Sequence, residues 1–599
     1  MLTAKTNVHA DALVGRKETM SHVICMGELL IDFVAIEKNT ELPKVSRFAA
    51  VAGGAPANVA VGLERLGRKT RFVGCVGEDP FGIKLRRELE AAGVEASFLF
   101  TPDDKEGGTD AVCTTINFVS VWDDGHKDLC FYRGADRCLL SQQITPAIFE
   151  NALCFHYGSI SLIDEPGSMA QHKAIQIARD KGLLITYDPN YRSTLWPNET
   201  AAHRVIFDAF KYAHMAKVSE EEFSVVTGRD NLEEGIRVLL DQGVELVVVS
   251  RGERGALAAN ERFVVESIPL GDVEIVETTG AGDAFMAALI SNMLPEFKKH
   301  GGSLKNVENE TVQAALDYAN VAGGLACTKA GAMPALPTAN EIDHFLDMRR
   351  RQNVLQSTST RSPLSVASYR LARMIDHTFL KPYCAEPIEI ERLCQEACQY
   401  GFATVCVNPS QVERCCQLLR GTSIRVGAAI GFPLGQTTLA VKAFEIRDAI
   451  HRGATEIDMV MNIRELQSGN YDLVLAEIDM LVQTCRESGA SSKVICKVIL
   501  ETCFLTTEEK IKACEICRDA GVDFVKSSTG FGPGGATVED IKLMRMTVGE
   551  VVGVKASGGI RDLATARAMV DAGANRIGTS SGVAMMQEML KEEEGALAG

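Results

Sequence analysis

The chain has 599 residues, of which 46% are hydrophobic and 24% charged, so it has the composition of a globular protein with more than one core. Its formal net charge of -17 argues against nucleic acid or an anionic membrane as the main partner. The 18 cysteines lie scattered through apolar stretches without paired zinc spacing, which indicates reduced thiols and a cytoplasmic location. No apolar run is long enough to predict a transmembrane helix.

The first 20 residues are expected to form a disordered N-terminal extension, because they contain Asp11 and Glu18 and lack the apolar core of a secretory signal. Residues 21–348 then alternate apolar strand-like runs with amphipathic helical runs, which predicts a mostly parallel sheet covered by helices. The polar, Ser/Thr-rich segment 349–364 is expected to be a linker that follows a last helix near 338–350.

A glycine-rich turn before a helix, EIVETTGAGDAF (274–285), is a candidate phosphoryl-transfer site. The backbone N–H groups of Gly280, Ala281 and Gly282 would meet at the helix N-terminus and form an anion hole for developing negative charge. Asp283 falls in the first turn, where its carboxylate could accept a proton from a hydroxyl group. Taken alone, the motif is equally explained by a capped helix after a glycine turn.

A second element, GGAPANVAVGLERLG (53–67), would let a polyhydroxy ligand approach the backbone. Together with GELLIDF, VGEDPFG, DPNYR and KVSEEEF, these segments resemble the PfkB (ribokinase-like) carbohydrate kinase family over about 22–345. The resemblance implies a ribokinase-like α/β sandwich with a small β lid to which VGEDPFG leads. It also implies phosphorylation of a sugar by ATP with Mg²⁺.

The resemblance assigns roles residue by residue. Asp283 would be the catalytic base, next to the anion hole already described. Two further groups would bind the substrates: for the sugar Asp32, Gly53, Gly54, Asn58 and Arg133, and for ATP and Mg²⁺ Asn190, Ser219, Glu222, Ser250, Gly252, Gly255 and Asn320. Ordinary loop or cap roles remain open for the ATP-side residues. The chain has Glu277 where the family usually has Asp, near the monovalent-cation site of some members, which leaves K⁺ activation open.

From residue 365 to the end, the pattern becomes more regular and predicts eight strands, each followed by a helix-length segment. Such a count is typical of a TIM (β/α)8 barrel, with a doubly wound sheet as the competing architecture. The predicted strands are 373–378, 403–408, 425–432, 456–462, 493–501, 524–529, 553–559 and 576–581.

Two neighbouring strands of this barrel each carry a lysine in an apolar run, Lys526 and Lys555. A buried ammonium group is costly, and two that lie close together are expected to lower each other's pKa. One could then attack a carbonyl as a neutral amine while the other stays protonated, with Asp458 placed to relay protons through water. The alternative is that both lysines only pair with carboxylates at the barrel mouth.

The loops after the last two strands contain Gly558, Gly559, Ser580 and Ser581, which suit a phosphate group in TIM barrels, although a glycine turn without phosphate is the alternative. The motifs IDHTFLKP, EIDMVMN, FVKSSTGF, VKASGGIR and GTSSG resemble those of deoxyribose-phosphate aldolases over about 365–590. The resemblance implies cleavage to glyceraldehyde 3-phosphate and acetaldehyde, without a cofactor.

By this resemblance Lys526 forms the Schiff base, Lys555 perturbs its pKa and Asp458 serves the proton relay. The remaining assignments are phosphate binding by Gly530, Gly558, Gly559, Ser580 and Ser581, and lining of the site by Thr378, Cys406 and Lys497. Phe531 stands where some members have a lysine that contributes to phosphate recognition.

The sequence therefore predicts a bifunctional enzyme whose kinase would convert 2-deoxyribose into the aldolase substrate 2-deoxyribose 5-phosphate. Because GGAPAN and FYR resemble fructokinases, a fructokinase or a ketodeoxygluconate-type kinase tethered to the aldolase is the alternative. A third possibility is that one half is catalytically silent and serves assembly. Both resemblances imply a homo-oligomer.

Overall fold

The computed structural model describes residues 21–102, 112–122, 127–267, 275–353, 364–381, 387–420, 422–487 and 494–598. Contacts divide the chain at Arg350 into two compact units, except that a short segment starting at Glu261 groups with the second unit. The expected extension, 1–20, lies outside the described residues, as does 354–363 of the expected linker. The start of that linker is helical, because the last helix of the first half extends to Asn353.

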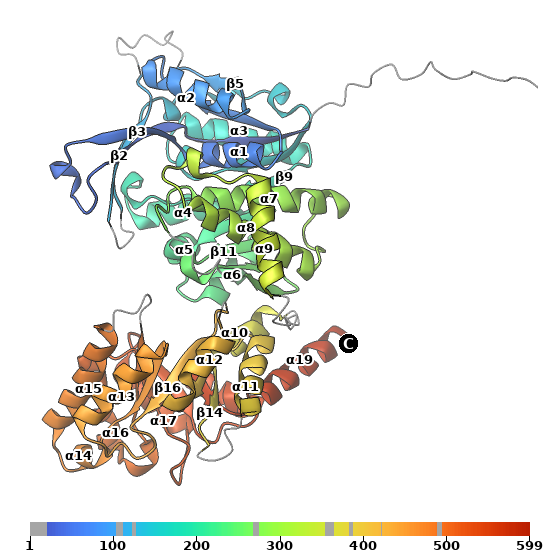
Figure 1. Cartoon of the computed structure of the whole chain (residues 1–599). Helices are drawn as coiled ribbons and strands as arrows, with labels where there is room; N and C mark the ends of the chain where they lie inside the picture. The colour runs from blue at the N-terminus through green and yellow to red at the C-terminus, as the bar shows by residue number, and fades with distance from the viewer. Residues whose placement is uncertain are drawn as a thin grey trace, which may run out of the picture. The chain divides into compact units, whose positions relative to one another are not determined.

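The first unit is built on a central sheet covered by helices (Figure 1). The part of this sheet that lies in the first unit has the strand order β12-β11-β10-β9-β8-β1-β4-β5. Neighbouring strands from β11 to β5 run parallel, while β12 is antiparallel to β11. The strands are almost entirely apolar, because a parallel sheet is buried on both faces. Their bounds are β1 (His22–Met26), β4 (Thr70–Cys75), β5 (Glu95–Phe100), β8 (Ala152–Tyr157), β9 (Leu184–Tyr187), β10 (Met215–Ser219), β11 (Leu246–Ser250) and β12 (Ala256–Ala259).

Helices cover this sheet, as the alternating sequence pattern predicts (Figure 1). The longest, α7, is buried over most of its length because it packs against both α1 and α8. The helices are α1 (Ala55–Arg65), α2 (Pro80–Ala91), α3 (Gly167–Asp180), α4 (Glu199–Phe210), α5 (Glu220–Thr227), α6 (Leu232–Asp241), α7 (Ala281–Lys299), α8 (Asn309–Ala326) and α9 (Ala339–Asn353).

A second, four-stranded sheet forms the expected lid, in the order β3-β2-β6-β7. The strands of this sheet are only partly buried. Contacts between aromatic side chains stabilise it: the ring of Phe33 stacks on that of Phe118, with centroids 5.2 Å apart. The segment VGEDPFG does not itself enter the lid, because Asp79 caps α2 there, but Phe81 contacts Phe33 edge-on. The strands are β2 (Leu30–Ala35), β3 (Phe48–Gly53), β6 (Ile116–Val121) and β7 (Lys127–Tyr132).

The second unit is a closed barrel of eight parallel strands, β14 to β21 in sequence order. Each predicted strand has its counterpart, so the prediction of a TIM barrel is confirmed. The strands are β14 (Ile375–Phe379), β15 (Thr404–Val407), β16 (Arg425–Ile430), β17 (Glu456–Val460), β18 (Ile495–Ile499), β19 (Phe524–Lys526), β20 (Gly553–Ser557) and β21 (Arg576–Thr579).

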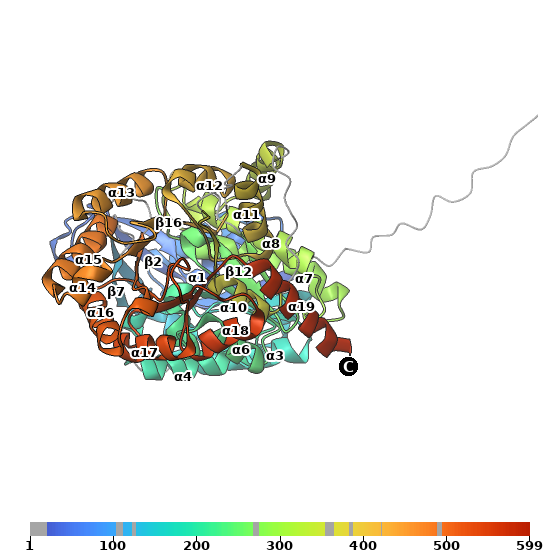
Figure 2. The ribbon, with the colours of Figure 1, turned by 90° about the horizontal axis from the view of Figure 1, so that it is seen from below.

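Helices surround the barrel, and the apolar core lies between them and the outer faces of the strands (Figure 2). The interior of the barrel is different, because charged side chains fill much of it. The helices are α10 (Val366–Met374), α11 (Pro387–Tyr400), α12 (Val412–Leu418), α13 (Leu439–His451), α14 (Ile463–Gln467), α15 (Tyr471–Arg486), α16 (Thr507–Ala520), α17 (Val538–Val548), α18 (Leu563–Asp571) and α19 (Gly582–Ala598).

A buried ion pair in the wall of the barrel ties two loops together. The ammonium group of Lys442 on α13 is fully buried, contacts Glu477 at 2.5 Å and donates to the carbonyls of Gly435 and Val460 at 2.8 and 2.7 Å. Glu477 in turn accepts the backbone N–H of Asn462 at 2.8 Å. These contacts fix the backbone that follows β16 and β17.

We therefore expect Lys442→Met to destabilise the barrel by about 3–5 kcal/mol, because Glu477 would stay buried without its cation. Urea unfolding of the full-length chain measures the change in free energy. The matched control is Lys512→Met, which removes an exposed lysine 3.7 Å from Glu515 and should cost below about 1 kcal/mol. Equal effects of the two substitutions would contradict the prediction.

Candidate active sites

A cluster of charged side chains fills the interior of the barrel. The carboxylates Asp376, Glu456 and Asp458 and the ammonium groups of Lys497 and Lys555 are fully buried, and Lys526 is 3% exposed. Burying so many charges is costly, and such clusters concentrate at functional sites. Asp376, Asp458, Lys497 and Lys555 lie inside their strands, whereas Glu456 is the first residue of β17 and Lys526 is the last residue of β19.

Asp458 connects the two lysines to which the sequence assigned catalysis in the barrel. One of its carboxylate oxygens, Oδ2, contacts Lys526 Nζ at 2.8 Å and Lys555 Nζ at 2.7 Å. The two lysines are register partners on β19 and β20, as neighbouring strands place them. The fold thus brings Asp458, Lys526 and Lys555 to one point.

The lysines do pair with carboxylates, as the alternative interpretation required, and this changes the electrostatics. Burial lowers the pKa of Lys555, but the charges of Asp376 and Asp458 outweigh it and hold that pKa above its ordinary value. The pKa of Lys497 is raised in the same way by Asp376, Asp458 and Glu456. The expectation that Lys555 has a lowered pKa is therefore wrong, and Lys555 stays protonated.

The charge balance singles out Lys526. Three lysines and Arg576 face three carboxylates, and Arg425 adds a further positive charge 3.9 Å from Glu456. Lys497 contacts all three carboxylates and Lys555 contacts two of them, whereas Asp458 is the carboxylate that contacts Lys526. Within the described residues, Lys526 thus makes fewer ion pairs than either of the other two lysines, which suits a nucleophile.

Two of the expected lining residues, Thr378 and Cys406, are register partners on β14 and β15. Cys406 on β15 is buried and its thiol lies 3.9 Å from Asp458 Oδ2, close enough for a weak S–H donation to the carboxylate. Burial raises the pKa of Cys406 to about 11, so the side chain stays a neutral thiol. Thr378 at the end of β14 is half-buried and donates to the carbonyl of Asp376 at 2.9 Å.

The expected phosphate-binding residues lie on loops at the carboxyl ends of β19, β20 and β21. Gly530, Gly558 and Gly559 have positive φ angles of 83°, 87° and 80°, which glycine adopts without strain. Gly530 and Gly558 are neighbours, since a Cβ added to Gly530 would lie 3.7 Å from the Cα of Gly558. Ser580 and Ser581 precede α19 directly, at a helix N-terminus.

In the first unit, the expected catalytic base lies at the start of α7. Gly280 caps this helix with φ 82°, Ala281 and Gly282 begin it, and Asp283 in the first turn is buried. Asn58 on α1 donates to Asp283 Oδ2 at 2.8 Å, which connects two motifs that are 225 residues apart. Burial raises the pKa of Asp283 to about 6, despite the opposing effect of this hydrogen bond.

Four of the expected sugar-binding residues, Asp32, Gly53, Gly54 and Asn58, lie around the junction of β3 and α1. A Cβ at Gly54 would lie 2.3 Å from the carbonyl oxygen of Glu28, so this position requires glycine. A Cβ at Gly53 would lie 2.1 Å from Asp32 Oδ2 and would displace that carboxylate. Asn117 on lid strand β6 donates to Asp32 Oδ1 at 2.8 Å. Burial raises the pKa of Asp32 to about 6. Asn117 was not singled out from the sequence.

Arg133 lies just after lid strand β7, and carboxylates hold its guanidinium. It donates to Asp136 at 2.6 and 2.9 Å and to Asp164 at 3.3 Å. These ion pairs fix the direction of the side chain. Its expected contact with the sugar stays a prediction.

The expected nucleotide-side residues follow the carboxyl ends of β9, β10 and β11, the edge where open parallel sheets bind ligands. Glu222 accepts hydrogen bonds from the N–H groups of Ser219 at 2.8 Å and Tyr191 at 2.6 Å. Ser219 and Glu222 thus cap the N-terminus of α5, which is the ordinary role that the sequence left open for them. Asn190, Gly252 and Gly255 have positive φ angles. Ser250 is the last residue of β11, and Asn320 lies on α8.

Sequence reasoning missed Lys217 and Asp188, although both belong to motifs quoted for the resemblance. Lys217 is buried and its ammonium group contacts Asp188 Oδ2 at 3.0 Å. A Cβ at Gly282 would lie 3.3 Å from Lys217 Nζ, so this cation borders the expected anion hole. A lysine within the apolar run of β10 was the signal, as it was in the barrel.

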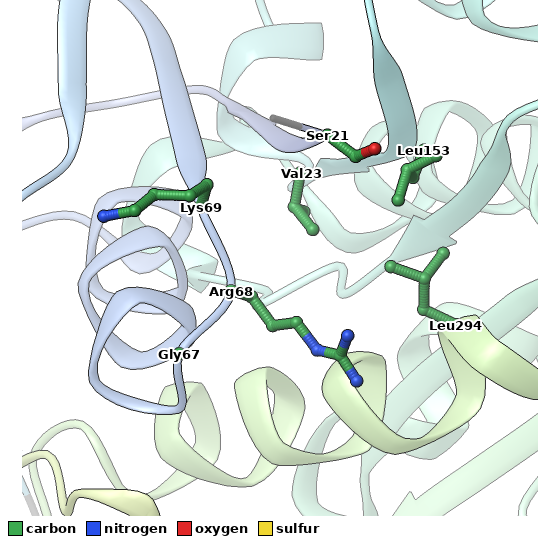
Figure 3. Close-up of a pocket in the computed structure, with 7 residues that line it drawn as sticks. All are labelled: Ser21, Val23, Gly67, Arg68, Lys69, Leu153 and Leu294. Atoms are coloured by element: carbon green, nitrogen blue, oxygen red, sulfur yellow. The ribbon is translucent and has the colours of Figure 1, made fainter. Parts of the chain in front are cut away.

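A cavity of about 340 Å³ lies elsewhere in the first unit (Figure 3). It is lined by residues at the amino ends of β1, β4 and β8, including Val23 and Leu153, and by Leu294 of α7. Arg68, which borders it, donates to the carbonyl of Ser291 at 2.7 Å. None of the expected site residues lines this cavity, because they lie at the carboxyl ends of the strands.

Comparison with known proteins matches a different family to each half of the chain. A model of the pfkB family of carbohydrate kinases matches residues 20–339, and a model of the DeoC/LacD family of aldolases matches residues 370–588. The deoxyribose-phosphate aldolase of Bacteroides thetaiotaomicron is 58% identical over 226 residues, 38% of this chain and 93% of the relative. That of Thermoanaerobacter sp. is 55% identical over 221 residues, covering 37% of this chain and 97% of the relative.

The chain belongs to both families. It joins a pfkB-family carbohydrate kinase to a deoxyribose-phosphate aldolase, as the sequence predicted. Among solved structures, a fructokinase from Xylella fastidiosa with bound ATP is 26% identical and covers 55% of this chain and 99% of its own, with a TM-score of 0.48. No helix within the described residues of the kinase–aldolase is long and apolar enough to cross a membrane.

The buried Asp283 leads to a prediction about stability and pH. Its pKa of about 6 in the fold exceeds the ordinary 3.8, so below about pH 4 the carboxyl is protonated in folded and unfolded chains alike. As the pH rises through 6, the folded chain must bury a charge, which costs about 3 kcal/mol. Asp283→Asn should recover this energy at pH 8 and gain nothing at pH 4.

Thermal unfolding at the two pH values measures this difference, and Asp241→Asn, an exposed position on α6, is the control. The control should change stability by less than about 0.5 kcal/mol at either pH. A gain from Asp283→Asn of equal size at both pH values would show that burial of the charge is not its cause.

Proposed function

We propose that Lys526 is the nucleophile of the aldolase and forms a Schiff base with the aldehyde carbon of 2-deoxyribose 5-phosphate. The observation that carries this proposal is the shared oxygen of Asp458, which places Lys526 beside a second, protonated lysine. The amine adds to the carbonyl and water leaves, giving an iminium ion. Cleavage of the bond between C2 and C3 then releases glyceraldehyde 3-phosphate and leaves an enamine of acetaldehyde on the lysine.

Asp458 would serve the proton transfers of this sequence through a water molecule. Protons must leave the C3 hydroxyl group, reach C2 of the enamine and return during hydrolysis of the final iminium ion. Lys555 and Lys497 hold Asp458 ionised, since the pKa of Asp458 lies well below its ordinary value despite burial. The loops with Gly530, Gly558, Gly559, Ser580 and Ser581 would bind the phosphate group through N–H and hydroxyl donors.

For the kinase, we propose that Asp283 accepts the proton of the sugar hydroxyl group as that oxygen attacks the terminal phosphate of ATP. The N–H groups of Gly280, Ala281 and Gly282 would stabilise the charge on the phosphoryl group in flight. Asp32, Gly53, Gly54, Asn58 and Arg133 would bind the sugar. ATP would lie along Asn190, Ser219, Ser250, Gly252, Gly255 and Asn320.

Mg²⁺ fits the same edge of the sheet. Asp188 Oδ1 is buried without a hydrogen-bond partner in the described structure, and Glu222 lies behind the same loop. These carboxylates would hold the ion, directly or through water, together with the phosphates. When bound, Mg²⁺ neutralises phosphate charge. Glu277, near the expected monovalent-cation site, accepts a hydrogen bond from the N–H of Gly331 at 2.8 Å. Kinase assays in KCl and in NaCl would decide whether potassium activates the enzyme.

We further propose that the two reactions run in sequence on one chain: the kinase phosphorylates 2-deoxyribose at its primary hydroxyl group, and the aldolase cleaves the product. The co-occurrence of the two families supports this order, because the aldolase needs a pentose phosphorylated at C5. The second candidate is a fructokinase, favoured by the GGAPAN and FYR motifs, or a ketodeoxygluconate-type kinase.

Replacing Lys526 by Ala should abolish the adduct that sodium borohydride traps between protein and acetaldehyde, because no amine remains at that point. Phosphorylation of sugar by the same variant should stay within about twofold of the parent, since changes at independent sites seldom interact. Intact-mass analysis detects the adduct. Lys542→Ala, at an exposed position on α17, is the control and should keep the adduct; trapping by the Lys526 variant would refute the assignment.

The sequential pathway is tested by acetaldehyde release from free 2-deoxyribose, with and without ATP and Mg²⁺, using 2-deoxyribose 5-phosphate as positive control. We expect release that depends on ATP and is lost in Asp283→Asn, because the base would be missing. Release from the phosphorylated sugar alone would reject 2-deoxyribose as the kinase substrate. Fructose, ribose and ketodeoxygluconate would then be compared as acceptors.

A further inference from the structure

Glu501 has a backbone conformation that residues other than glycine rarely adopt. It lies two residues after the end of β18, with φ 55° and ψ 61°, in the left-handed region. Its side chain is 2% exposed although it carries a carboxylate. Strained backbone and buried charge both cost free energy, and such features cluster at functional sites.

The carboxylate of Glu501 holds the loop that follows the Schiff-base lysine. Its oxygens accept the backbone N–H of Thr529 at 3.1 and 3.3 Å, and Oε2 also accepts the hydroxyl group of Thr529. The same hydroxyl oxygen accepts the N–H of Phe531 at 3.0 Å. One buried carboxylate thus fixes the chain on both sides of Gly530.

The backbone around Glu501 reinforces this attachment. The N–H of Leu500 donates to the carbonyl of Lys526 at 2.9 Å, and the N–H of Thr502 donates to the carbonyl of Ser527 at 3.0 Å. These two bonds flank Glu501, so its left-handed conformation turns the side chain towards Thr529 while its neighbours stay bound to the next strand.

The held loop in turn contacts the turn after β20. The N–H of Ala536 donates to the carbonyl of Gly558 at 3.0 Å, and a Cβ added to Gly535 would lie 2.2 Å from that same oxygen. Ser527 and Ser557 exchange two hydrogen bonds of 3.0 Å. A displacement of the loop would therefore move Gly530 and Gly558 relative to each other.

We propose that Glu501 is a positioning residue for recognition of the substrate's phosphate group: it holds Thr529 and thereby sets the place of Gly530 against Gly558. The inference rests on the proposed function, in which these glycines bind the phosphate. Among the described residues, the carboxylate of Glu501 has its hydrogen bonds in this loop region and none to Lys526 or Asp458, so we expect it to act through the loop. Loss of Glu501 should therefore impair binding of the phosphate more than the chemistry on the aldehyde.

The test compares two substrates of the full-length chain, 2-deoxyribose 5-phosphate and, without ATP, unphosphorylated 2-deoxyribose. For Glu501→Ala we expect the KM for the phosphorylated sugar to rise about tenfold or more, because hydrogen bonds to a charged acceptor are lost. The kcat/KM for 2-deoxyribose should change less than about twofold, since that sugar has no phosphate to misplace. Inhibition by inorganic phosphate should weaken in parallel.

Two further variants keep the test decisive. Glu501→Gly also removes the carboxylate but accepts the left-handed backbone without strain, so it should show the same KM change with better stability if the Ala variant folds poorly. Glu477→Gln is the matched control, a buried glutamate that holds another loop through the N–H of Asn462. It should change the kcat/KM of both substrates by the same factor.

Loss of activity by the same factor on both substrates in the Glu501 variants, or no loss, would overturn the inference. The failure of the proposed function looks different. In that case the parent enzyme itself would show no preference for the phosphorylated sugar and no inhibition by inorganic phosphate.

Discussion

Charge compensation inside the barrel is the constraint on which the aldolase half depends. An ammonium group in an apolar interior is tolerated only with carboxylates around it, and Asp376, Glu456 and Asp458 supply them. Because Asp458 contacts three lysines, a substitution there would affect the whole cluster. The same arrangement keeps Lys555 protonated and leaves Lys526 with few carboxylate contacts, which is the difference between two lysines that the Schiff-base chemistry requires.

In the kinase half, burial raises the pKa of carboxylates, whereas the lysines of the barrel lower the pKa of Asp458. The interior of the kinase half buries carboxylates, and the pKa values of Asp32 and Asp283 rise to about 6 because water is excluded. A carboxylate with this pKa is ionised at neutral pH and is also basic enough to accept a proton as the hydroxyl group attacks. The stability that the fold gives up at Asp283 is thus linked to the chemistry proposed for that residue.

Loops in both halves take their position from hydrogen bonds that reach across strands. Asn58 connects the glycine-rich turn of α1 to the start of α7, and Glu501 connects the end of β18 to the loop after β19. In each case a short polar side chain holds a glycine-containing segment, whose backbone would otherwise have more freedom than other residues. Binding of a phosphate or phosphoryl group by backbone N–H groups requires such support.

The sequence by itself determined the alternation of strands and helices, the eight-stranded barrel and the candidates Lys526, Lys555 and Asp458, because these depend on local periodicity and on charged residues in apolar runs. Asp283 was a candidate because it follows a glycine-rich turn at a helix start, and the ribokinase-like fold followed from the resemblance of several motifs to one family. The tertiary structure decided which charges meet. The pairing of Lys497 with Asp376, of Lys217 with Asp188 and of Glu501 with Thr529 joins residues far apart along the chain. A pKa depends on such neighbours, so the raised pKa of Lys555 emerges only when the barrel closes.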